Sequence, residues 1–496
     1  MPVSNSLVNA ASVFQTSASR LGPRCEKLSR PTTVLVLAMV FGFAAPSGGY
    51  AATLTVCASG CNYTTIAAAI AAAKADDTIS ILDAVHTEGG ITVDRNLIIA
   101  GKGAAKTALV GGFLGTVFSV NSGVAATFQN LTIRDSSSGA IYNSGSVSIQ
   151  NCAFSGNFGP NGGAAVYNAS GTLTINNSTF SKNVSFGGGG ALANADGTMT
   201  ISSSILSGNG SHIGGGAVAN AGGTVVVSNS SLSGNGGRVA GAIYNQQGSL
   251  ILSNSAVSDN DAIAGGGVEN EGTFTIINST LDGNRADYSG GAAFNDGTVQ
   301  ISFSTLSANI ERNEFGVNDG GGGITNFGSA TVKNSIVADN TLETPDGSAS
   351  PGDCAGTITA SGANFDTSGS CGTTNFTQVT SAELNLGAFT LNPPGTTATR
   401  ALLSGSVAIG AVTDCTDVDE KSVTTDQRGT LRPDPGDTVC DAGAYELQKF
   451  AGQPNCVGKS NSALAQQYGG LSAAASAYGF STVKQLKAAV RKSCEG

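Results

Sequence analysis

Asparagine returns at a nearly constant interval through the middle of the chain, and this repeat constrains the fold more than any other feature. The repeat follows the pattern N-x-x-[FLV]-x-x-N, and most copies begin 24 to 26 residues apart. The first column of asparagines is Asn130, Asn151, Asn177, Asn229, Asn254, Asn278 and Asn334, with Ser203 and Phe303 as substitutes. The second column is Asn157, Asn183, Asn209, Asn235, Asn260, Asn284, Asn309 and Asn340. A third column follows a glycine-rich stretch and is Asn143, Asn168, Asn194, Asn220, Asn245, Asn270, Asn295 and Asn326. A fixed period of this length indicates a solenoid of stacked coils.

Each repeat predicts three short strands. One strand contains the middle apolar residue of the pattern, such as Phe180, and one follows the glycines, such as Leu192. The third alternates apolar residues in steps of two, such as Met199 and Ile201, which places them on one face of a strand. No repeat has the i, i+3, i+4 spacing of an amphipathic helix. We therefore predict an all-β fold, a right-handed parallel β-helix of the pectin-lyase-like kind, followed by a small C-terminal α-helical tail.

Two other solenoids fit the repeat less well. Leucine-rich repeats share its length and its asparagine ladder, but they need several leucines per unit and often a helix. Calcium-binding repeats of the glycine- and aspartate-rich kind have a nine-residue period, which this sequence lacks.

The glycines and asparagines suit the corners of such coils. Glycine adopts positive φ without strain, and asparagine tolerates the left-handed region. Identical asparagines on successive coils, about 4.8 Å apart, can hydrogen-bond up the stack and satisfy buried backbone amides of the turns. We therefore interpret the second column as a structural ladder made of Asn157, Asn183, Asn209, Asn235, Asn260, Asn284 and Asn309.

Residues 1–51 are expected to be an export signal. Four basic residues precede the apolar run 33–45, which is short for a bilayer, and Gly49-Tyr50-Ala51 offers a small-x-small cleavage site. A retained membrane anchor is the alternative. Removing four basic residues and one acid takes the formal net charge from −10 to −13, which argues against a nucleic-acid partner. No other apolar run is long enough to span a membrane.

The cysteines predict an exported, disulfide-bonded protein. Proximity in the sequence suggests the pairs Cys57/Cys61, Cys354/Cys371, Cys415/Cys440 and Cys456/Cys494. Cys25 leaves with the signal, and Cys152 is expected to be a small buried hydrophobe. The absence of CxxC spacing argues against a zinc site.

We expect three regions after the signal. Residues 52–400 form the β-helix, with an N-terminal cap and first coils at 52–110, regular coils at 111–340 and irregular coils at 341–400. Within this cap, residues 63–74 predict a short helix. Residues 401–447 are expected to cap the C-terminal end. Residues 448–496 predict a helical tail clasped by a disulfide, and Ser481 is the expected N-cap of its last helix.

Residues in the C-terminal region carry a family resemblance. The segments 426–429 (DQRG) and 440–446 (CDAGAYE), with Arg432-Pro433 between them, resemble the C-terminal signature of bacterial choice-of-anchor Q surface proteins. The coils are also similar to repeats of polymorphic outer membrane proteins, whose FxxN and GGA elements appear at Phe154–Asn157, Phe180–Asn183, Gly163–Ala164 and Gly291–Ala292. The resemblance covers roughly residues 53–447. It implies a parallel β-helix, export and a role at or beyond the cell surface, and it implies no catalysis. The sequence departs from the family at 448–496, which predict helices where an anchoring segment is expected.

Acidic residues concentrate in the late coils. Glu271 and Asp296 each follow a third-column asparagine on adjacent coils, and Glu269 lies two residues before Glu271. If these three side chains converge, they form a candidate metal site for Ca²⁺, which binds carboxylate oxygens. The alternative is a solvated acidic edge. We assign no catalytic residue and no cofactor other than this calcium hypothesis.

The residue before each third-column asparagine is expected to point to solvent. This outward column reads Tyr142, Tyr167, Ala193, Ala219, Tyr244, Glu269, Phe294 and Thr325. Its aromatic members, Tyr142, Tyr167, Tyr244 and Phe294, are candidates for stacking on sugar rings. The alternative is that they stabilise neighbouring strands by stacking on one another.

Two functions remain open from the sequence. The first is a non-catalytic, adhesin-like or structural protein, secreted or at the surface of a Gram-negative bacterium, that binds extracellular polysaccharide or a neighbouring cell surface. The second is a polysaccharide-active enzyme, a lyase or glycoside hydrolase, which would need several convergent carboxylates. The regular coils favour the first.

Overall fold

The computed structural model describes residues 51–312, 320–344 and 346–494. The predicted signal peptide, apart from Ala51, lies outside these residues, and so does Cys25. Within the described ranges, no helix is long and apolar enough to cross a membrane.

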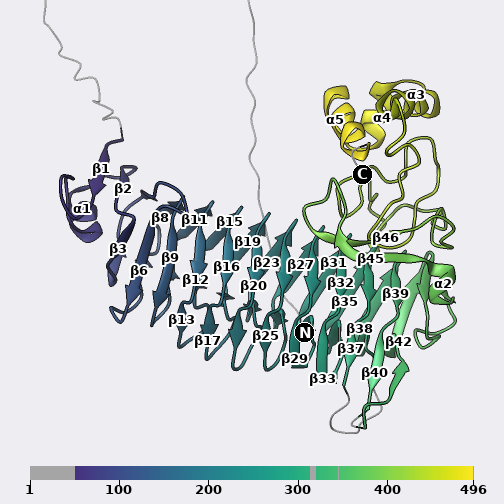
Figure 1. The fold of residues 1–496 in the computed structure, drawn as a ribbon, viewed down its shortest axis with the longest axis horizontal. Coiled ribbons are helices and arrows are strands. Elements are labelled where there is room, and N and C mark those ends of the chain that lie inside the picture. Colours follow the sequence, from purple (N-terminus) through teal and green to yellow (C-terminus); the bar gives the residue numbers. More distant parts are fainter. Residues whose placement is uncertain (1–50, 313–319, 345, 495–496) are drawn as a thin grey trace, which may run out of the picture. The chain divides into compact units, whose positions relative to one another are not determined.

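The described chain winds into stacked coils whose strands form three sheets, which are parallel except for the last pair of sheet C (Figure 1). Sheet A has 22 strands and receives two strands from each regular coil, whereas sheets B and C, with 13 and 9 strands, receive one each. Register is kept from coil to coil, so that Phe154 pairs with Phe180 and Tyr142 with Tyr167. The prediction of an all-β parallel β-helix with a small helical tail is confirmed.

The strands of the regular coils fall into four rows. The outward column belongs to the first row of sheet A, which is β10 (Ile141–Asn143), β14 (Val166–Asn168), β18 (Leu192–Asn194), β22 (Val218–Asn220), β26 (Ile243–Asn245), β30 (Val268–Asn270), β34 (Ala293–Asn295) and β38 (Ile324–Lys333). The second row of sheet A is β11 (Ser146–Gln150), β15 (Thr172–Asn176), β19 (Thr198–Ser202), β23 (Thr224–Ser228), β27 (Ser249–Ser253), β31 (Thr273–Ile277) and β35 (Thr298–Ser302). Sheet B continues through β12 (Ala153–Ser155), β16 (Thr179–Ser181), β20 (Ile205–Ser207), β24 (Ser231–Ser233), β28 (Ala256–Ser258), β32 (Thr280–Asp282), β36 (Thr305–Ser307), β39 (Ile336–Ala338), β43 (Asn364–Asp366) and β44 (Phe376–Gln378). Sheet C is β13 (Phe158–Gly159), β17 (Val184–Ser185), β21 (Gly210–Ser211), β25 (Gly236–Gly237), β29 (Asp261–Ala264), β33 (Arg285–Ser289), β37 (Ile310–Glu311), β40 (Thr341–Glu343) and β41 (Ala349–Pro351).

The ends of the solenoid add further elements. Before the regular coils lie β1 (Thr53–Val56), α1 (Ile66–Ala72), β2 (Thr78–Ile81), β3 (Val85–Thr87), β4 (Ile91–Val93), β5 (Leu97–Ala100), β6 (Ala108–Gly112), β7 (Phe118–Val120), β8 (Ala125–Gln129) and β9 (Thr132–Ser136). After them lie β42 (Cys354–Ser361), α2 (Ser381–Leu384), β45 (Leu386–Leu391), β46 (Ala398–Leu402), α3 (Cys456–Tyr468), α4 (Leu471–Ala477) and α5 (Val483–Ser493).

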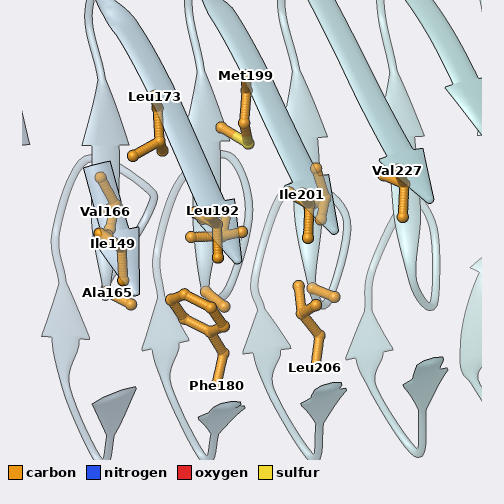
Figure 2. Close-up of a cluster of buried hydrophobic side chains, with 14 of the residues drawn as sticks. Ile149, Ala165, Val166, Leu173, Phe180, Leu192, Met199, Ile201, Leu206 and Val227 are labelled. Carbon is orange, nitrogen blue, oxygen red and sulfur yellow. The ribbon is translucent and has the colours of Figure 1, made fainter. Parts of the chain in front are cut away.

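The interior of the coils is filled by layers of aliphatic and phenylalanine side chains. In Figure 2, Leu192, Met199 and Phe180 extend into the same interior from three different strands. All three are fully buried, and the rings of Phe154 and Phe180 stack with centroids 5.0 Å apart. Each inward side chain therefore packs against the side chain at the same position of the next coil. Repeated from coil to coil, these contacts form one continuous core without any tryptophan.

The three asparagine columns lie at corners of the coils. Every residue of the first column, including the substitutes Ser203 and Phe303, has a left-handed backbone with φ between 45° and 57°. Side chains of the second column are buried, and the Asn183 Nδ2 donates to Asn209 Oδ1 at 3.0 Å. The third column makes the same contact, with Asn194 Nδ2 donating to Asn220 Oδ1 at 2.8 Å.

The first helix, α1, is held to the coils by an acid–histidine pair. The Glu88 carboxylate accepts hydrogen bonds from the backbone amides of Ile66 (2.6 Å) and Ala67 (2.9 Å) at the start of the helix. It also lies 2.9 Å from His86 Nε2, while Asp83 lies 3.2 Å from Nδ1. The hydrogen bond with Glu88 raises the pKa of His86. This histidine therefore anchors the N-terminal helix.

Residues 401–447 pack on the side of the last coils. The outer residues of β20 and β24 are exposed or half-buried, whereas every residue of β32 and β36 is buried. The covering segment reaches them through hydrogen bonds such as Thr280 Oγ1 to Gln427 Oε1 (2.6 Å) and Ala444 N to Thr305 Oγ1 (3.1 Å). The expectation of a cap over the end is corrected here, because the segment docks on the outer face of sheet B.

The residues that carry the family resemblance form the buried centre of this docked segment. Arg428 Nη2 lies 2.8 Å from Asp426 Oδ2, and Arg432 Nε lies 3.1 Å from Glu446 Oε2. The Arg432 guanidinium also covers the ring of Phe303, at 4.3 Å from its centroid. Burial raises the pKa of Glu446 well above its usual value. Phe303 therefore replaces asparagine in the first column at a coil where the docked segment lies.

The tail forms three helices, and four disulfides join the described cysteines. The bonds are Cys57–Cys61, Cys354–Cys371, Cys415–Cys440 and Cys456–Cys494, as proximity suggested, while Cys152 is free and buried. The N-cap expected at Ser481 is Thr482, whose hydroxyl accepts from Gln485 N at 3.2 Å. The helix starts one residue later because Gln485 Oε1 accepts a hydrogen bond from the backbone amide of Thr482, which completes a capping box.

Removing one member of the second-column ladder should destabilise the coils. In Asn209→Ala, the backbone amide of Asn183 and the carbonyl of Phe180 lose hydrogen bonds that are both 3.0 Å long. Because buried unpaired polar groups cost about 1–3 kcal/mol each, we expect the free energy of unfolding to fall by about 3 kcal/mol. Thermal unfolding followed by circular dichroism measures the change. Thr174→Ala, at an exposed position of β15, is the control, and equal melting temperatures for both variants would contradict the ladder's role.

Candidate functional site

The outward column of sheet A is less exposed than the sequence suggested. Tyr142 is 43% exposed and Tyr167, Tyr244 and Phe294 are half-buried, whereas Ala193, Ala219, Glu269 and Thr325 are buried. The expectation that the whole column faces solvent is therefore wrong for these four residues. The cause is the glycine-rich turn before each strand, which folds over it. A Cβ atom on Gly188 would lie 3.4 Å from Ala193 Cβ, and one on Gly265 would lie 2.9 Å from Glu269 Cβ.

The aromatic members of the column are unevenly spaced along the axis of the solenoid. The rings of Tyr142 and Tyr167 stack on adjacent strands, with centroids 5.5 Å apart and an interplanar angle of 11°. Tyr244 is three coils beyond Tyr167, a rise of about 14 Å at one strand spacing per coil. Phe294 contacts Phe327, which is 63% exposed, with ring centroids 5.7 Å apart.

The small residues between Tyr167 and Tyr244 leave a cavity of 370 Å³. The lining includes Ala193 and Ala219 of the outward column, Tyr167 and Tyr244, and the turn residues Ile213 and Val239. A second cavity of 290 Å³ adjoins it and is lined by Tyr142, Tyr167, Asn161 and the glycines of two turns. We call these two cavities the aromatic groove. A volume in this range, with an apolar and aromatic lining and a few polar groups, is typical of small-ligand sites.

Two aromatic side chains beside the groove were not singled out from the sequence. Phe186, which is 50% exposed, contacts Phe158 and His212 with ring centroids 5.2 and 4.7 Å away. They occur in or next to strands of sheet C, on consecutive coils. Phe158 lies one residue after Asn157 and Phe186 three residues after Asn183, so they do not share a position in the repeat, and the spacing of the repeat did not identify them.

Beyond Tyr244, on the next strand and outside the groove, Glu269 is a buried acid without a partner. It occupies the outward column between Tyr244 and Phe294, its register neighbours on the adjacent strands. The side chain is 8% exposed, and its Oε2 atom makes no hydrogen bond in the described structure. Burial, followed by the charges of Glu271 and Asp296, raises the pKa of Glu269 to about 8. At neutral pH this carboxyl is therefore mostly protonated.

The other two acids of the candidate metal site are more exposed. Glu271 accepts a hydrogen bond of 2.8 Å from the hydroxyl of Tyr244, which links it to the groove. Burial and this contact raise the pKa of Tyr244. Asp296 is exposed on the next coil. Although the three carboxyls influence one another, the described residues contain no group of three or more acids, histidines or cysteines that could hold a metal ion. The calcium interpretation of Glu269, Glu271 and Asp296 is therefore corrected.

The remaining candidates have structural contacts. Arg312 forms ion pairs with Asp287 (2.7 Å) and Asp261 (2.9 Å), which join three successive coils along sheet C. Cys152 is buried, and desolvation raises the pKa of its thiol to about 11, so that it is an unreactive part of the core.

The chain was compared with known proteins. The family model described as right handed beta helix region matches residues 115–306. Among solved structures, the chain is similar to pectate lyase Pel9A, with 15% identity, a TM-score of 0.43, and coverage of 81% of this chain and 97% of that one. It is also similar to the PL6 family alginate lyase AlyGC, with 12% identity, a TM-score of 0.31, and coverage of 74% of this chain and 58% of that one. No curated protein matches. The family match and the coil geometry agree on a right-handed parallel β-helix.

Glu269 should give the stability of the protein a measurable pH dependence. Its folded pKa of about 8 lies above the usual 4.5 of a glutamate, so the folded state holds a proton that the unfolded state has lost. Stability therefore falls as pH rises from about 4.5 to about 8. In Glu269→Gln this contribution disappears. We expect wild type and variant to melt within about 1 °C of each other at pH 5, and the variant to melt several degrees higher at pH 9.

Two other buried acids, Glu311 and Asp434, also make the stability of both proteins depend on pH. Burial raises the pKa of Glu311 and of Asp434 to about 7, so both lower the stability over a similar pH range in either protein. The relevant quantity is therefore the difference between the two melting temperatures at each pH. A difference that does not change from pH 5 to pH 9 would show that Glu269 is ionised throughout.

Proposed function

We propose that this protein is a non-catalytic, exported β-helix protein that binds a carbohydrate polymer in the aromatic groove. The observation that carries the proposal is the alternation of tyrosine platforms with a hollow floored by Ala193 and Ala219. Sugar rings present apolar faces that stack on aromatic rings, while their hydroxyls need amide and carbonyl partners at the edges. The groove supplies both kinds of contact.

The polar groups of the groove suit the hydroxyl groups of a sugar. Asn161 lines both cavities and Gln246 lines the larger one, and each offers a donor and an acceptor to hydroxyl groups. None of the residues that line the two cavities is charged. Tyr142 stacks on the ring of Tyr167 and extends the row of aromatic side chains along the coil axis, which favours an extended polymer over a single small molecule.

Other features support a location outside the cytoplasm. Four disulfides join the described cysteines, and such bonds persist in oxidising compartments. The resemblance of the docked C-terminal segment to choice-of-anchor Q proteins supports placement at a bacterial cell surface. The groove would then meet polysaccharide of the surroundings or of a neighbouring cell.

Replacing either tyrosine at the ends of the larger cavity should weaken retention on carbohydrate. We expect Tyr167→Ala and Tyr244→Ala each to lower the affinity for a retained polysaccharide about tenfold or more, since each removes one stacking platform worth about 1–2 kcal/mol. Affinity electrophoresis against a panel of neutral, acidic and amino polysaccharides measures it. Phe113→Ala is the matched control, because Phe113 is 96% exposed and lies outside the groove. Equal retention of all three variants would place binding elsewhere.

Hydrolysis of a polysaccharide is the second candidate function, and Glu269 is the observation that favours it. A protonated carboxyl near two other carboxyls, Glu271 and Asp296, has the components of a general acid and a base. The same panel separates the two functions. Release of reducing ends by the wild type, lost in Glu269→Gln, would establish the enzyme, whereas retention without products supports the binding protein.

A further inference from the structure

We propose that the acidic cluster of Glu269, Glu271 and Asp296, which adjoins the aromatic groove beyond Tyr244, binds the ammonium group of an amino sugar, so that the carbohydrate ligand is a hexosamine polymer. This inference rests on the proposed carbohydrate binding and specifies its chemistry. The recognition element is Glu269, supported by Glu271 and Asp296, immediately beyond Tyr244.

Glu269 has a buried carboxylate oxygen, Oε2, that accepts no hydrogen bond from the described residues. The backbone turn at Gly265 covers the side chain, which leaves it 8% exposed, and its Oε2 atom has no hydrogen-bond partner. A buried acceptor without a partner is costly, so its presence calls for an explanation, and a donor supplied by a ligand is one. A ligand donor that reaches Oε2 would remove this cost.

The charge around Glu269 is negative and uncompensated. Glu271 and Asp296 both act on its carboxyl and oppose its ionisation. The ion pairs of the late coils join Arg312 with Asp261 and Asp287, and Arg400 with Asp282. In the part of the chain that the structure describes, no ion pair reaches Glu269, Glu271 or Asp296. The cluster therefore lacks a cation and would gain one from the ligand.

An ammonium group on a sugar ring fits this cluster better than a metal ion. The carboxyls do not form a set that could hold a metal, whereas an ammonium needs only separate acceptors for its three donors. Tyr244 and Phe294 flank Glu269 on the neighbouring strands, so a ring resting on either one would place a substituent near the carboxyl. Aromatic faces also attract cations.

The same charges disfavour a polyuronate. A chain of carboxylates that followed the groove from the uncharged cavities past Tyr244 would meet Glu271 and Asp296 without a basic partner. The repulsion between these like charges would weaken binding, because no basic side chain of the described chain lies there to offset it. The inference therefore separates this groove from sites that take acidic polysaccharides.

Binding of three oligosaccharides of equal length tests the inference. Isothermal titration calorimetry at pH 6 compares oligomers of glucosamine, N-acetylglucosamine and galacturonate. We expect the glucosamine oligomer to bind at least tenfold more tightly than the acetylated one, and the galacturonate oligomer to bind more weakly than both. An ammonium bound to Glu269 displaces its proton, so binding of glucosamine should release protons, seen as a dependence of the heat on the buffer's ionisation enthalpy.

Variants assign the effect to the cluster. In Glu269→Gln and Glu271→Gln, the ratio of the two affinities, glucosamine to N-acetylglucosamine, should fall towards one, and Glu269→Gln should end the proton release. Asp196→Asn is the matched control, because it removes an exposed acid from another turn of the same edge. It should leave the ratio as in the wild type.

The outcomes separate the two proposals. If the neutral or the galacturonate oligomer binds as tightly as glucosamine, or if Asp196→Asn changes the ratio as much as Glu269→Gln does, the amino-sugar inference is wrong while carbohydrate binding stands. If none of the three oligomers binds and the polysaccharide panel also shows no retention, carbohydrate binding itself is wrong.

Discussion

The hydrogen bonds between stacked asparagine side chains are the interaction on which the rest of this molecule depends. The strands are only two to five residues long in most coils, so they leave many turn amides and carbonyls without strand partners. Each second-column amide fills two of these gaps: Asn209 accepts from the Asn183 backbone and donates to the Phe180 carbonyl. Because the same bonds recur on every coil, successive coils keep one register, and every column of side chains becomes a straight row.

The straight rows explain why exceptions to the repeat have such defined surroundings. A residue that departs from its column lies between the equivalent residues of the coils before and after it, and the strand register fixes the positions of both neighbours. Ala193 and Ala219 open a hollow because they stand where tyrosines stand on other coils. Glu269 is enclosed because the glycine turn that covers an alanine elsewhere covers a carboxyl here. Phe303 takes an asparagine position and receives the Arg432 guanidinium. The candidate site and the docking surface are both built from such departures.

Much of the fold could be predicted because the contacts that form the coils are periodic in the sequence. The partner of a residue such as Asn183 lies one repeat away, so a constant interval identifies it. The C-terminal segment is different. Thr280 and Gln427 meet although they are 147 residues apart, and no period in the sequence relates them. The burial of β32 and β36 by this segment, and its position on the side of the solenoid, therefore could not be derived from the pattern.

The sequence by itself determined the solenoid, its three corner columns and the outward direction of the aromatic residues, because these follow from local spacing and strand alternation. Only the tertiary structure decided how far those residues are exposed. The turns fold back over the sheet to different extents. Equivalent positions of the outward column therefore hold an exposed tyrosine, the alanines that line a cavity, or a buried glutamate. The ionisation of Glu269 depends on that covering backbone and on two neighbouring charges brought close by the coils. Burial depends on which segments of the folded chain pack over a side chain, and the repeat pattern of the sequence does not specify those contacts.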